Sequence, residues 1–551
     1  MPKLTEQTAA SAPLPRAATP EEVGVSSGAI LELLEEYDKQ GLEYHGLMIL
    51  RHGKVAYEIY RRPYAPEIPH AIYSFSKSVA GTAVGFAIDE GLFSLDTTLA
   101  ELFPEYAAGK SERWKRITVR HMLTMTSGLA FDVFHKASSP DWVGDYLNSK
   151  LRDEPGATFH YTNENAYIFS VLIRRLTGQT LFEYLTPRLF VPLGIDVPYT
   201  ETDRFGNPAG GWGIYWKLED SARFIQCYLD GGKWQGTQVI PEWWAREATR
   251  KQVDNPENPK ADSRAGYGYQ FWMCAKPNTF AARGMFTQQG MAMRDQDAVF
   301  VYFGADADEQ KPQDVIFPHF PDGFCEEGAA PDEAALAKIR ELQQNLAFPS
   351  SPVLPRSPLE ETLSRSVIRI RPNYFLNAIG FPWGFLPMTV NQMSVDHGGY
   401  INNFQLEFKD SELQFSWQES KDGKDKLSVP LGLDGEYRAG HISLCGFEFD
   451  TLGSAHWQDS RTLVLSIRPM QSCALRTFTL RFSGKRVHIV PHSTPTFRSI
   501  AKNLAVLSHA YLNNSGFFNV FADAIFAIAP SIMEPHLFGR IRTINNRPEK
   551  K

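Results

Sequence analysis

One stretch, Tyr73 to Ala87, constrains the fold of this chain more than any other. After Lys77 its residues are small or apolar for three helical turns. This pattern predicts a helix that is packed on all sides in the middle of a large domain. Ser74 and Lys77 are one turn apart, so they would share a face at the start of that helix. The stretch therefore predicts a core element that carries a polar pair.

The Ser74 and Lys77 pair suits nucleophilic catalysis. A serine is a weak nucleophile until a base removes its proton. Burial disfavours the charged form of Lys77, so its amine can accept that proton, and N–H groups at the helix start stabilise negative charge near Ser74. The alternative is a capping serine and an ordinary lysine, because the same spacing recurs at Ser499 to Lys502 without evident chemistry. Spacing alone leaves both interpretations open.

A second motif, Tyr161-Thr162-Asn163, precedes a predicted helix over residues 164–176. At a helix entry, Tyr161 and Asn163 can point into one cleft. Tyr161 as a phenolate held by Lys77 would relay the serine proton, and the Asn163 amide would hold a substrate carbonyl. Tyr-x-Asn also occurs at residues 400–402 and 511–513, so only the joint pattern favours a catalytic site.

Composition bounds the class of protein. The chain has 551 residues, more than one hydrophobic core usually holds, so two domains are expected. Hydrophobic residues make up 43%, charged residues 22%, and the net charge is -7, which indicates a soluble globular protein without a nucleic-acid footprint. Five scattered cysteines indicate free thiols in a reducing compartment. Without H-x-H or H-E-x-x-H spacing, neither a metal site nor a cofactor is expected.

The termini indicate a cytoplasmic protein. Residues 1–20 lack an apolar segment behind a basic start, so no secretory signal is predicted. The longest apolar run, Phe517 to Pro530, is too short to span a bilayer. The oligomeric state is left open.

The order of predicted elements indicates an α+β fold. A hairpin over 46–60, a run of helices, and strands over 268–303 predict an antiparallel sheet flanked by helices, with an all-helical insert. The predicted divisions are a disordered arm (1–20), the catalytic domain (21–347), a Pro-rich linker (348–358), a mostly β accessory domain (359–496) and a helical C-terminal tail (497–551).

Several segments together resemble a known family, the serine hydrolases related to class C β-lactamases and penicillin-binding proteins. They occur in the expected order over about residues 20–325, and they are 20–26, 50–55, 73–78, 117–129, 160–163, 210–213 and 267–272. Within that family, the chain most resembles the branch of the 6-aminohexanoate-dimer hydrolases.

The resemblance implies a β-lactamase-like fold and an acyl-enzyme mechanism on a small-molecule ester or amide. It assigns Ser74 as nucleophile, Lys77 and Tyr161 as the coupled base, and Asn163 as a substrate contact. It also implies a third motif on a sheet-edge strand, which supplies one N–H of the oxyanion hole.

Two segments are candidates for that third motif. Gly284 to Gln288 resembles the Gly-x-x-Gly-Gln of the branch, with Thr287 in place of the second glycine and Gln288 as a substrate contact. The other candidate is His397-Gly398-Gly399, where a turn is the more ordinary role for two glycines. We favour the first.

Substrate identity is less constrained. Trp212 and Tyr215, near a Gly-Gly turn, are candidates for an aromatic pocket, although packing explains them equally well. Gly284 to Gln288 contains no cation, so weak or absent β-lactamase activity is expected unless the adjacent Arg283 supplies one. The alternatives are an acyltransferase that uses the same acyl-enzyme and a non-catalytic binding module. The intact Ser74, Lys77 and Tyr161 argue against the binding module.

Overall fold

The structure is a computed structural model, and it describes residues 12–129, 141–203, 205–371, 401–418, 426–444, 447–496, 498 and 534–544. The chain divides into two compact units, and the division falls between Ala347 and Phe348. The finer division into catalytic domain, linker and accessory domain stays a prediction.

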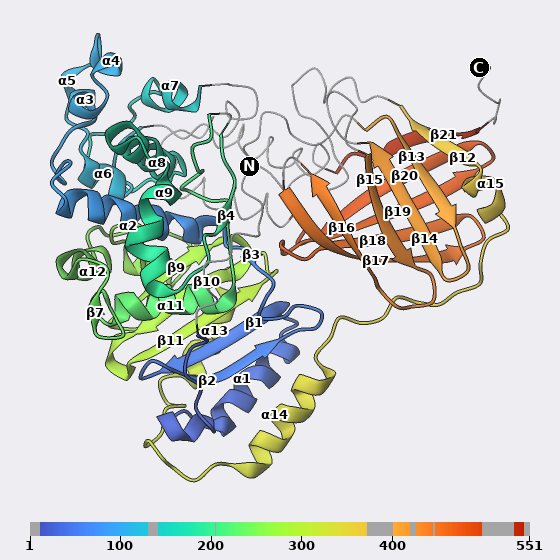
Figure 1. The fold of residues 1–551 in the computed structure, drawn as a ribbon, viewed down its shortest axis with the longest axis horizontal. Coiled ribbons are helices and arrows are strands. Elements are labelled where there is room, and N and C mark those ends of the chain that lie inside the picture. Colours follow the sequence, from blue (N-terminus) through green and yellow to red (C-terminus); the bar gives the residue numbers. More distant parts are fainter. Residues whose placement is uncertain are drawn as a thin grey trace. The chain divides into compact units, whose positions relative to one another are not determined.

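The first unit is built on a six-stranded antiparallel sheet of order β2-β1-β11-β10-β9-β8 (Figure 1). Its strands are β1 (Tyr44–Arg51), β2 (Lys54–Tyr60), β8 (Trp272–Met273), β9 (Thr279–Gly284), β10 (Gln288–Met293) and β11 (Ala298–Gly304). The early hairpin joins the late strands through the β1–β11 pairing, with Met48 opposite Val301. The helical segment between them is therefore an insert, and the predicted α+β class is confirmed.

Helices cover both faces of this sheet (Figure 1). On one face α1 (Ser27–Lys39), α13 (Lys311–His319) and α14 (Glu333–Asn345) enclose an apolar core. On the other face α11 (Leu218–Leu229) packs against β1, β10 and β11. Ser26 caps α1 by accepting a hydrogen bond from the Ala29 N–H.

The helix α2 (Ser76–Asp89) lies in the interior, and its residues from Ser76 to Ala87 are all buried. Glycine is required inside it, because a Cβ at Gly85 would overlap the Trp244 indole. The helix α8 (Glu164–Thr177) packs against α2. The remaining helices around it are α3 (Leu99–Leu102), α4 (Pro104–Ala107), α5 (Glu112–Lys115), α6 (Val119–Leu123), α7 (Trp142–Leu147), α9 (Leu181–Leu185), η3 (Thr186–Phe190), α10 (Val191–Leu193) and α12 (Glu242–Ala248).

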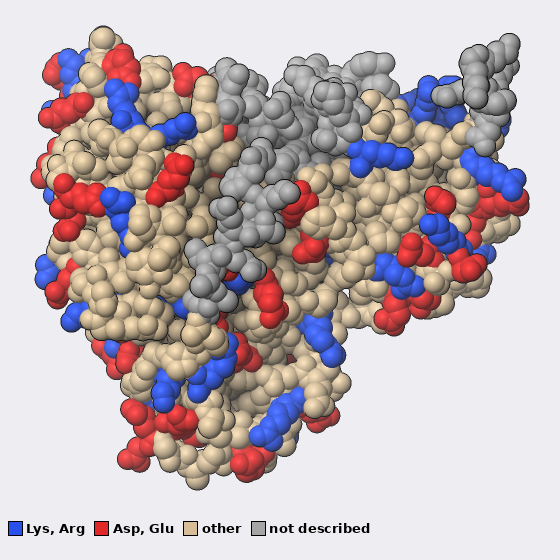
Figure 2. Space-filling model, viewed as in Figure 1, with Lys and Arg blue, Asp and Glu red and all other residues tan. Residues whose placement is uncertain are grey.

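Small sheets complete the first unit. One contains β3 (His70–Ala71), β4 (Tyr199–Thr200) and β5 (Ile214–Trp216), and another contains β6 (Lys233–Trp234) and β7 (Thr237–Gln238). The strand β3 leads directly to the turn that carries Ser74. Acidic and basic side chains are interspersed on the face of the molecule that Figure 2 shows.

Residues 12–20 correct the expectation of a disordered arm. Leu14 is buried, and its N–H donates to Glu219 Oε1 at 2.8 Å. Arg16 forms ion pairs with both Glu58 and Glu219. Backbone hydrogen bonds join this segment to Val55 of β2. The apolar side chain and the arginine between two carboxylates hold the segment in place despite its disorder-prone composition.

The second unit is mostly β, as predicted. Its ten strands form one sheet of order β15-β14-β13-β12-β21-β20-β19-β18-β17-β16, and a further β15–β17 pairing closes the sheet on itself. The elements are α15 (Glu360–Ser364), β12 (Ser366–Ile370), β13 (Asn403–Phe408), β14 (Glu412–Gln418), β15 (Lys426–Gly432), β16 (Arg438–Leu444), β17 (Phe447–Asp459), β18 (Thr462–Pro469), β19 (Leu475–Ser483), β20 (Arg486–Thr494) and β21 (Leu537–Thr543).

The strand β21 corrects the expectation of a helical tail over 497–551. It lies between β12 and β20 and pairs with both. Leu537 and Gly539 are buried, whereas Phe538 and Arg540 are exposed. This alternation has the period of a strand. Residues 499–533 and 545–551 lie outside the described residues, and no described helix has the length and apolarity to cross a membrane.

Candidate active site

Ser74 lies in a tight turn between β3 and α2. Its turn, η2, covers Tyr73–Phe75 and leads straight into α2. Tyr73 has a φ of 44°, a left-handed conformation that costs energy for a residue with a side chain. The next residue, Phe75, is fully buried, and Ser74 itself is only partly buried. The strained turn thus presents the Ser74 hydroxyl at the surface of a rigid core.

Lys77 is fully buried and surrounded by acceptors. Its Nζ lies 2.9 Å from Ser74 Oγ, 2.6 Å from Asn163 Oδ1 and 2.7 Å from the Gly211 carbonyl oxygen. The two carbonyl oxygens can only accept, so two N–H bonds of Lys77 must point at them. The remaining position of the amine faces Ser74. It is an N–H bond when Lys77 is charged and the lone pair when Lys77 is neutral.

The glycine turn that supplies the Gly211 carbonyl was not assigned to the site from the sequence. A Cβ at Gly211 would lie 2.6 Å from the Asn163 carbonyl oxygen, and one at Gly210 would overlap the Ala166 carbonyl oxygen. Two glycines are therefore needed for the turn to pack against the first turn of α8. The Gly-Gly pair was the only signal in the sequence.

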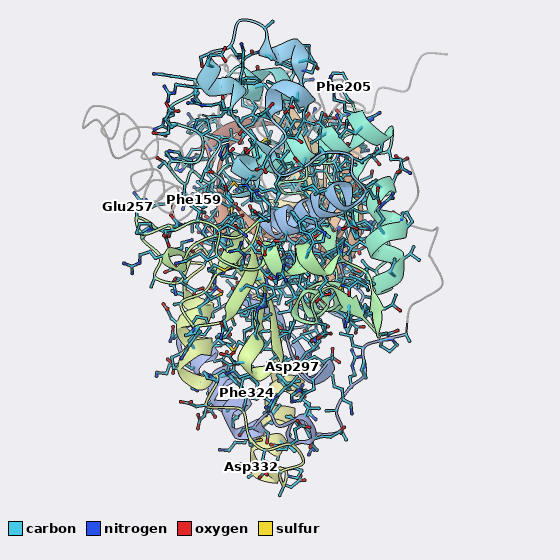
Figure 3. All side chains as sticks on the ribbon, turned by 90° about the vertical axis from the view of Figure 1, so that its left-hand side faces the viewer. Phe159, Phe205, Glu257, Asp297, Phe324 and Asp332 are labelled. Atoms are coloured by element: carbon cyan, nitrogen blue, oxygen red, sulfur yellow. The ribbon has the colours of Figure 1, made fainter. Side chains whose placement is uncertain are left out.

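Tyr161 lies beside Lys77, and an aromatic cluster fixes its ring. Lys77 Nζ is 4.8 Å from the centroid of the Tyr161 ring. The ring stacks on Trp272, with the ring centroids 5.4 Å apart and an interplanar angle of 27°. The Tyr267 ring packs edge-on against it, with the centroids 6.3 Å apart. Phe159, labelled in Figure 3, packs against both Trp272 and Tyr267. The structure thus places the predicted Ser74, Lys77, Tyr161 and Asn163 together.

The hairpin from Gly284 to Gln288 lies next to Ser74. A Cβ on Gly284 would overlap the Ile72 carbonyl oxygen and lie 3.2 Å from the Ser74 nitrogen. Phe286 and Thr287 have φ values of 61° and 71°, so two residues with side chains adopt the left-handed conformation in succession. The favoured candidate for the third motif therefore reaches the Ser74 N–H. The other candidate, residues 397–399, lies outside the described residues.

Gln288 does not meet the expectation of a substrate contact. Its side chain is fully buried, and its Nε2 donates to the Phe286 carbonyl at 2.9 Å and the Gly304 carbonyl at 2.7 Å. The amide therefore braces the strained turn from inside the sheet.

The predicted aromatic residues are largely inside the first unit. Trp212 is 7% exposed, and its Nε1 donates to Glu201 Oε2 at 3.0 Å. Tyr215 is 4% exposed and packs edge-on against Tyr199. Their exposure indicates that packing is their main role.

Arg283 is held by an acidic partner. Its guanidinium pairs with Asp262, whose side chain is 1% exposed, and donates to Cys274 Sγ at 3.1 Å. The charge of Arg283 is therefore already balanced inside the first unit. Within the described residues, no group of three or more His, Cys, Asp or Glu side chains is arranged to hold a metal ion.

The chain is similar to known hydrolases in sequence. A family model described as Beta-lactamase matches residues 30–315. A 6-aminohexanoate-dimer hydrolase of Paenarthrobacter ureafaciens is 26% identical over 281 residues, which are 46% of this chain and 71% of the relative. Protein flp of Staphylococcus aureus (strain NCTC 8325 / PS 47) is 25% identical over 136 residues, which are 23% of this chain and only 27% of the relative.

Solved structures show similarity at lower sequence identity. EstCE1, described as a hydrolase with promiscuous acyltransferase activity, is 16% identical with a TM-score of 0.44, and the match covers 53% of this chain and 99% of that chain. SurE with D-Leu is 15% identical with a TM-score of 0.46, and the match covers 83% of this chain and 94% of that chain.

Replacing Gly284 with alanine should abolish most activity without unfolding the protein. The new Cβ would push the hairpin away from Ile72 and Ser74, and loss of one oxyanion donor costs about a hundredfold or more in kcat. Ester turnover and thermal unfolding should be measured together. Gly28→Ala in α1 is the matched control, because its nearest contacts lie at 3.4 Å and beyond. A Gly284→Ala enzyme with normal kcat would remove this hairpin from the site.

Proposed function

This chain belongs to the beta-lactamase family and is a serine hydrolase of ester or amide bonds, and we propose that it works through an acyl-enzyme on Ser74. One observation carries the proposal. Lys77, fully buried, has two of its three hydrogen-bonding positions taken by carbonyl oxygens and directs the third at Ser74 Oγ. This geometry suits a base that receives the serine proton.

Acylation begins when neutral Lys77 accepts the hydroxyl proton of Ser74. The Oγ forms a bond to the substrate carbonyl carbon, and the carbonyl oxygen becomes negatively charged. The Ser74 N–H and an N–H of the hairpin 284–288 would stabilise that oxygen, since the hairpin reaches the Ser74 nitrogen. The strained turns at Tyr73 and Phe286 fix these donors before substrate binds.

Collapse of the tetrahedral intermediate requires a proton for the leaving group. Tyr161 lies against Lys77 and would deliver the proton to the departing alcohol or amine. The resulting ester on Ser74 is then attacked by water, the same groups act in reverse order, and Ser74 regains its proton. The stack on Trp272 holds the Tyr161 ring in place through both half-reactions.

Asn163 serves both the base and the substrate in this proposal. Its Oδ1 accepts a hydrogen bond from an N–H of Lys77, which both the charged and the neutral amine can donate, so the lysine sets the orientation of the amide. The Nδ2 group then remains to donate to the carbonyl of a bound ester or amide. The substrate class follows the relative from Paenarthrobacter ureafaciens, whose name specifies an amide dimer.

Ser74→Ala should lower turnover of a p-nitrophenyl ester by several orders of magnitude, because the covalent intermediate can no longer form. A fluorophosphonate probe should label the unmodified protein on Ser74, as found by peptide mapping. The alanine variant should stay unlabelled while keeping its thermal unfolding midpoint. Labelling of another serine, with Ser74 untouched, would overturn the assignment.

Lys77→Ala and Tyr161→Phe should not have additive effects. Both groups hold the same proton in transit, so the double variant should be about as inactive as the worse single variant. Single-turnover acylation and deacylation rates measured on all four proteins test this. Effects that multiply would show that the two residues act independently.

A chromogenic cephalosporin should be a much poorer substrate than a short-chain p-nitrophenyl ester. The hairpin 284–288 has no cation for the antibiotic carboxylate, and Arg283 is committed to Asp262. Loss of such a contact costs about 1.5 to 3 kcal/mol, or one to two decades in kcat/KM. Comparable kcat/KM values for the two substrates would refute this specificity, and the acyl-enzyme mechanism would still stand.

A further inference from the structure

Four strands of the second unit lie side by side in its sheet (Figure 1). Their outer face is rich in arginine. The strands are β19, β20, β21 and β12, and their buried and exposed residues alternate. We call the outward-facing cations of these strands the arginine face, and they are Arg369, Arg481, Arg486, Arg540 and Arg542. All five are exposed.

Three of these arginines form one row across three strands. Arg540 pairs directly with Arg486 on one side and with Arg369 on the other. Like charges directly opposite each other destabilise a sheet. The row is therefore a local cost to folding, and an anionic partner would relieve it.

The arginine face contains no compensating acid. The sequences of the four strands include no Asp or Glu, although the whole chain has a net charge of -7. None of the five guanidinium groups forms an ion pair with a residue in the described part of the chain. Other surface arginines of this unit do find acids, as Arg438 does with Asp434 at 2.6 Å. Within the described residues, the positive charge of this face is not neutralised by an acid.

An exposed aromatic ring lies within the arginine face. Phe538 is 54% exposed, next to Arg540 in β21. Its ring stacks on His488, with the ring centroids 4.8 Å apart and an interplanar angle of 10°. Nδ1 of His536 lies 3.2 Å from Nε2 of His488. Burial is the main reason that the pKa of His488 lies below its ordinary value. The neighbouring His536 and Arg481 lower this pKa further. The ring therefore lies among the histidine and arginine side chains of this face.

We propose that the arginine face binds peripherally to the surface of an anionic phospholipid bilayer. A single phosphate can be held by one or two arginines, whereas this face spreads its charge over four strands of a continuous sheet. Basic clusters with an exposed aromatic residue suit the headgroup region, where phosphates meet the cations and the ring enters the interface. This inference does not depend on the catalytic proposal.

Sedimentation of the full chain with lipid vesicles tests the proposal. Vesicles of phosphatidylglycerol and phosphatidylcholine in equal amounts should bind the protein at low salt, and vesicles of phosphatidylcholine alone should not. Binding should weaken as salt is raised, because screening reduces each contact. The combined variant Arg369→Gln, Arg486→Gln, Arg540→Gln should bind at least tenfold more weakly, since each basic residue near a membrane is worth roughly fivefold.

A matched triple variant controls for net charge. Lys39→Gln, Lys409→Gln and Lys426→Gln remove the same charge from exposed positions outside the arginine face, and binding should stay within about twofold of the unmodified protein. The arginine variant should keep its thermal midpoint and its ester turnover, because it relieves repulsion and leaves the first unit unchanged. Phe538→Ala should weaken vesicle binding while its salt dependence remains.

Three results would overturn the proposal. The first is equal binding to anionic and neutral vesicles, which would show that charge is not the determinant. The second is anionic vesicle binding that the arginine variant retains in full. The third is retention of a short duplex DNA by this face with no vesicle binding, which would make the partner a nucleic acid.

Discussion

The buried amine of Lys77 is the constraint on which the active site depends. An amine removed from water must find hydrogen-bonding partners, and here Ser74, Asn163 and Gly211 provide them from three separate segments. Satisfying the lysine therefore brings together the start of α2, the start of α8 and a glycine turn. The requirement that a buried polar group be satisfied assembles the reacting groups.

Close backbone approach is the second requirement. Gly284 lies against Ile72 and the Ser74 nitrogen, and Gly211 lies against the Asn163 carbonyl, at separations that a Cβ would not permit. Tyr73 and Phe286 accept left-handed conformations at the same place and pack edge-on at 5.3 Å. The buried amide of Gln288 supports the hairpin from behind. Backbone strain beside Ser74 is thus opposed by packing on both sides of it.

The second unit follows a simpler rule. Its strands alternate buried apolar residues with outward polar ones, and the sheet closes on itself, so one face fills the interior and the other is left for charge. That freedom explains how the outer face of four strands can concentrate arginine without disturbing the fold. The arginine face is thus a local concentration of charge within a unit whose Arg356 and Arg438 pair with acids.

Periodicity and short spacings were readable from the sequence because they are local. The apolar run after Lys77 predicted the buried helix, and the order of hairpin, helices and strands predicted the α+β sheet. Alternation predicted the second sheet. The same reasoning failed for residues 12–20, because the two carboxylates that hold Arg16 are distant in sequence. It also failed for β21, whose short sequence forms a strand through its pairing with β12 and β20.

For the active site, the sequence by itself determined which residue types were present: a serine and a lysine one turn apart, a tyrosine and an asparagine at a helix start. Only the tertiary structure decided that the Gly211 carbonyl, 134 residues from Lys77, completes the amine's surroundings. It also decided that the Gln288 side chain faces inward and that Arg283 forms an ion pair with Asp262. The physical reason is that hydrogen bonds and ion pairs between distant segments depend on how backbones approach one another, and no local pattern encodes that distance.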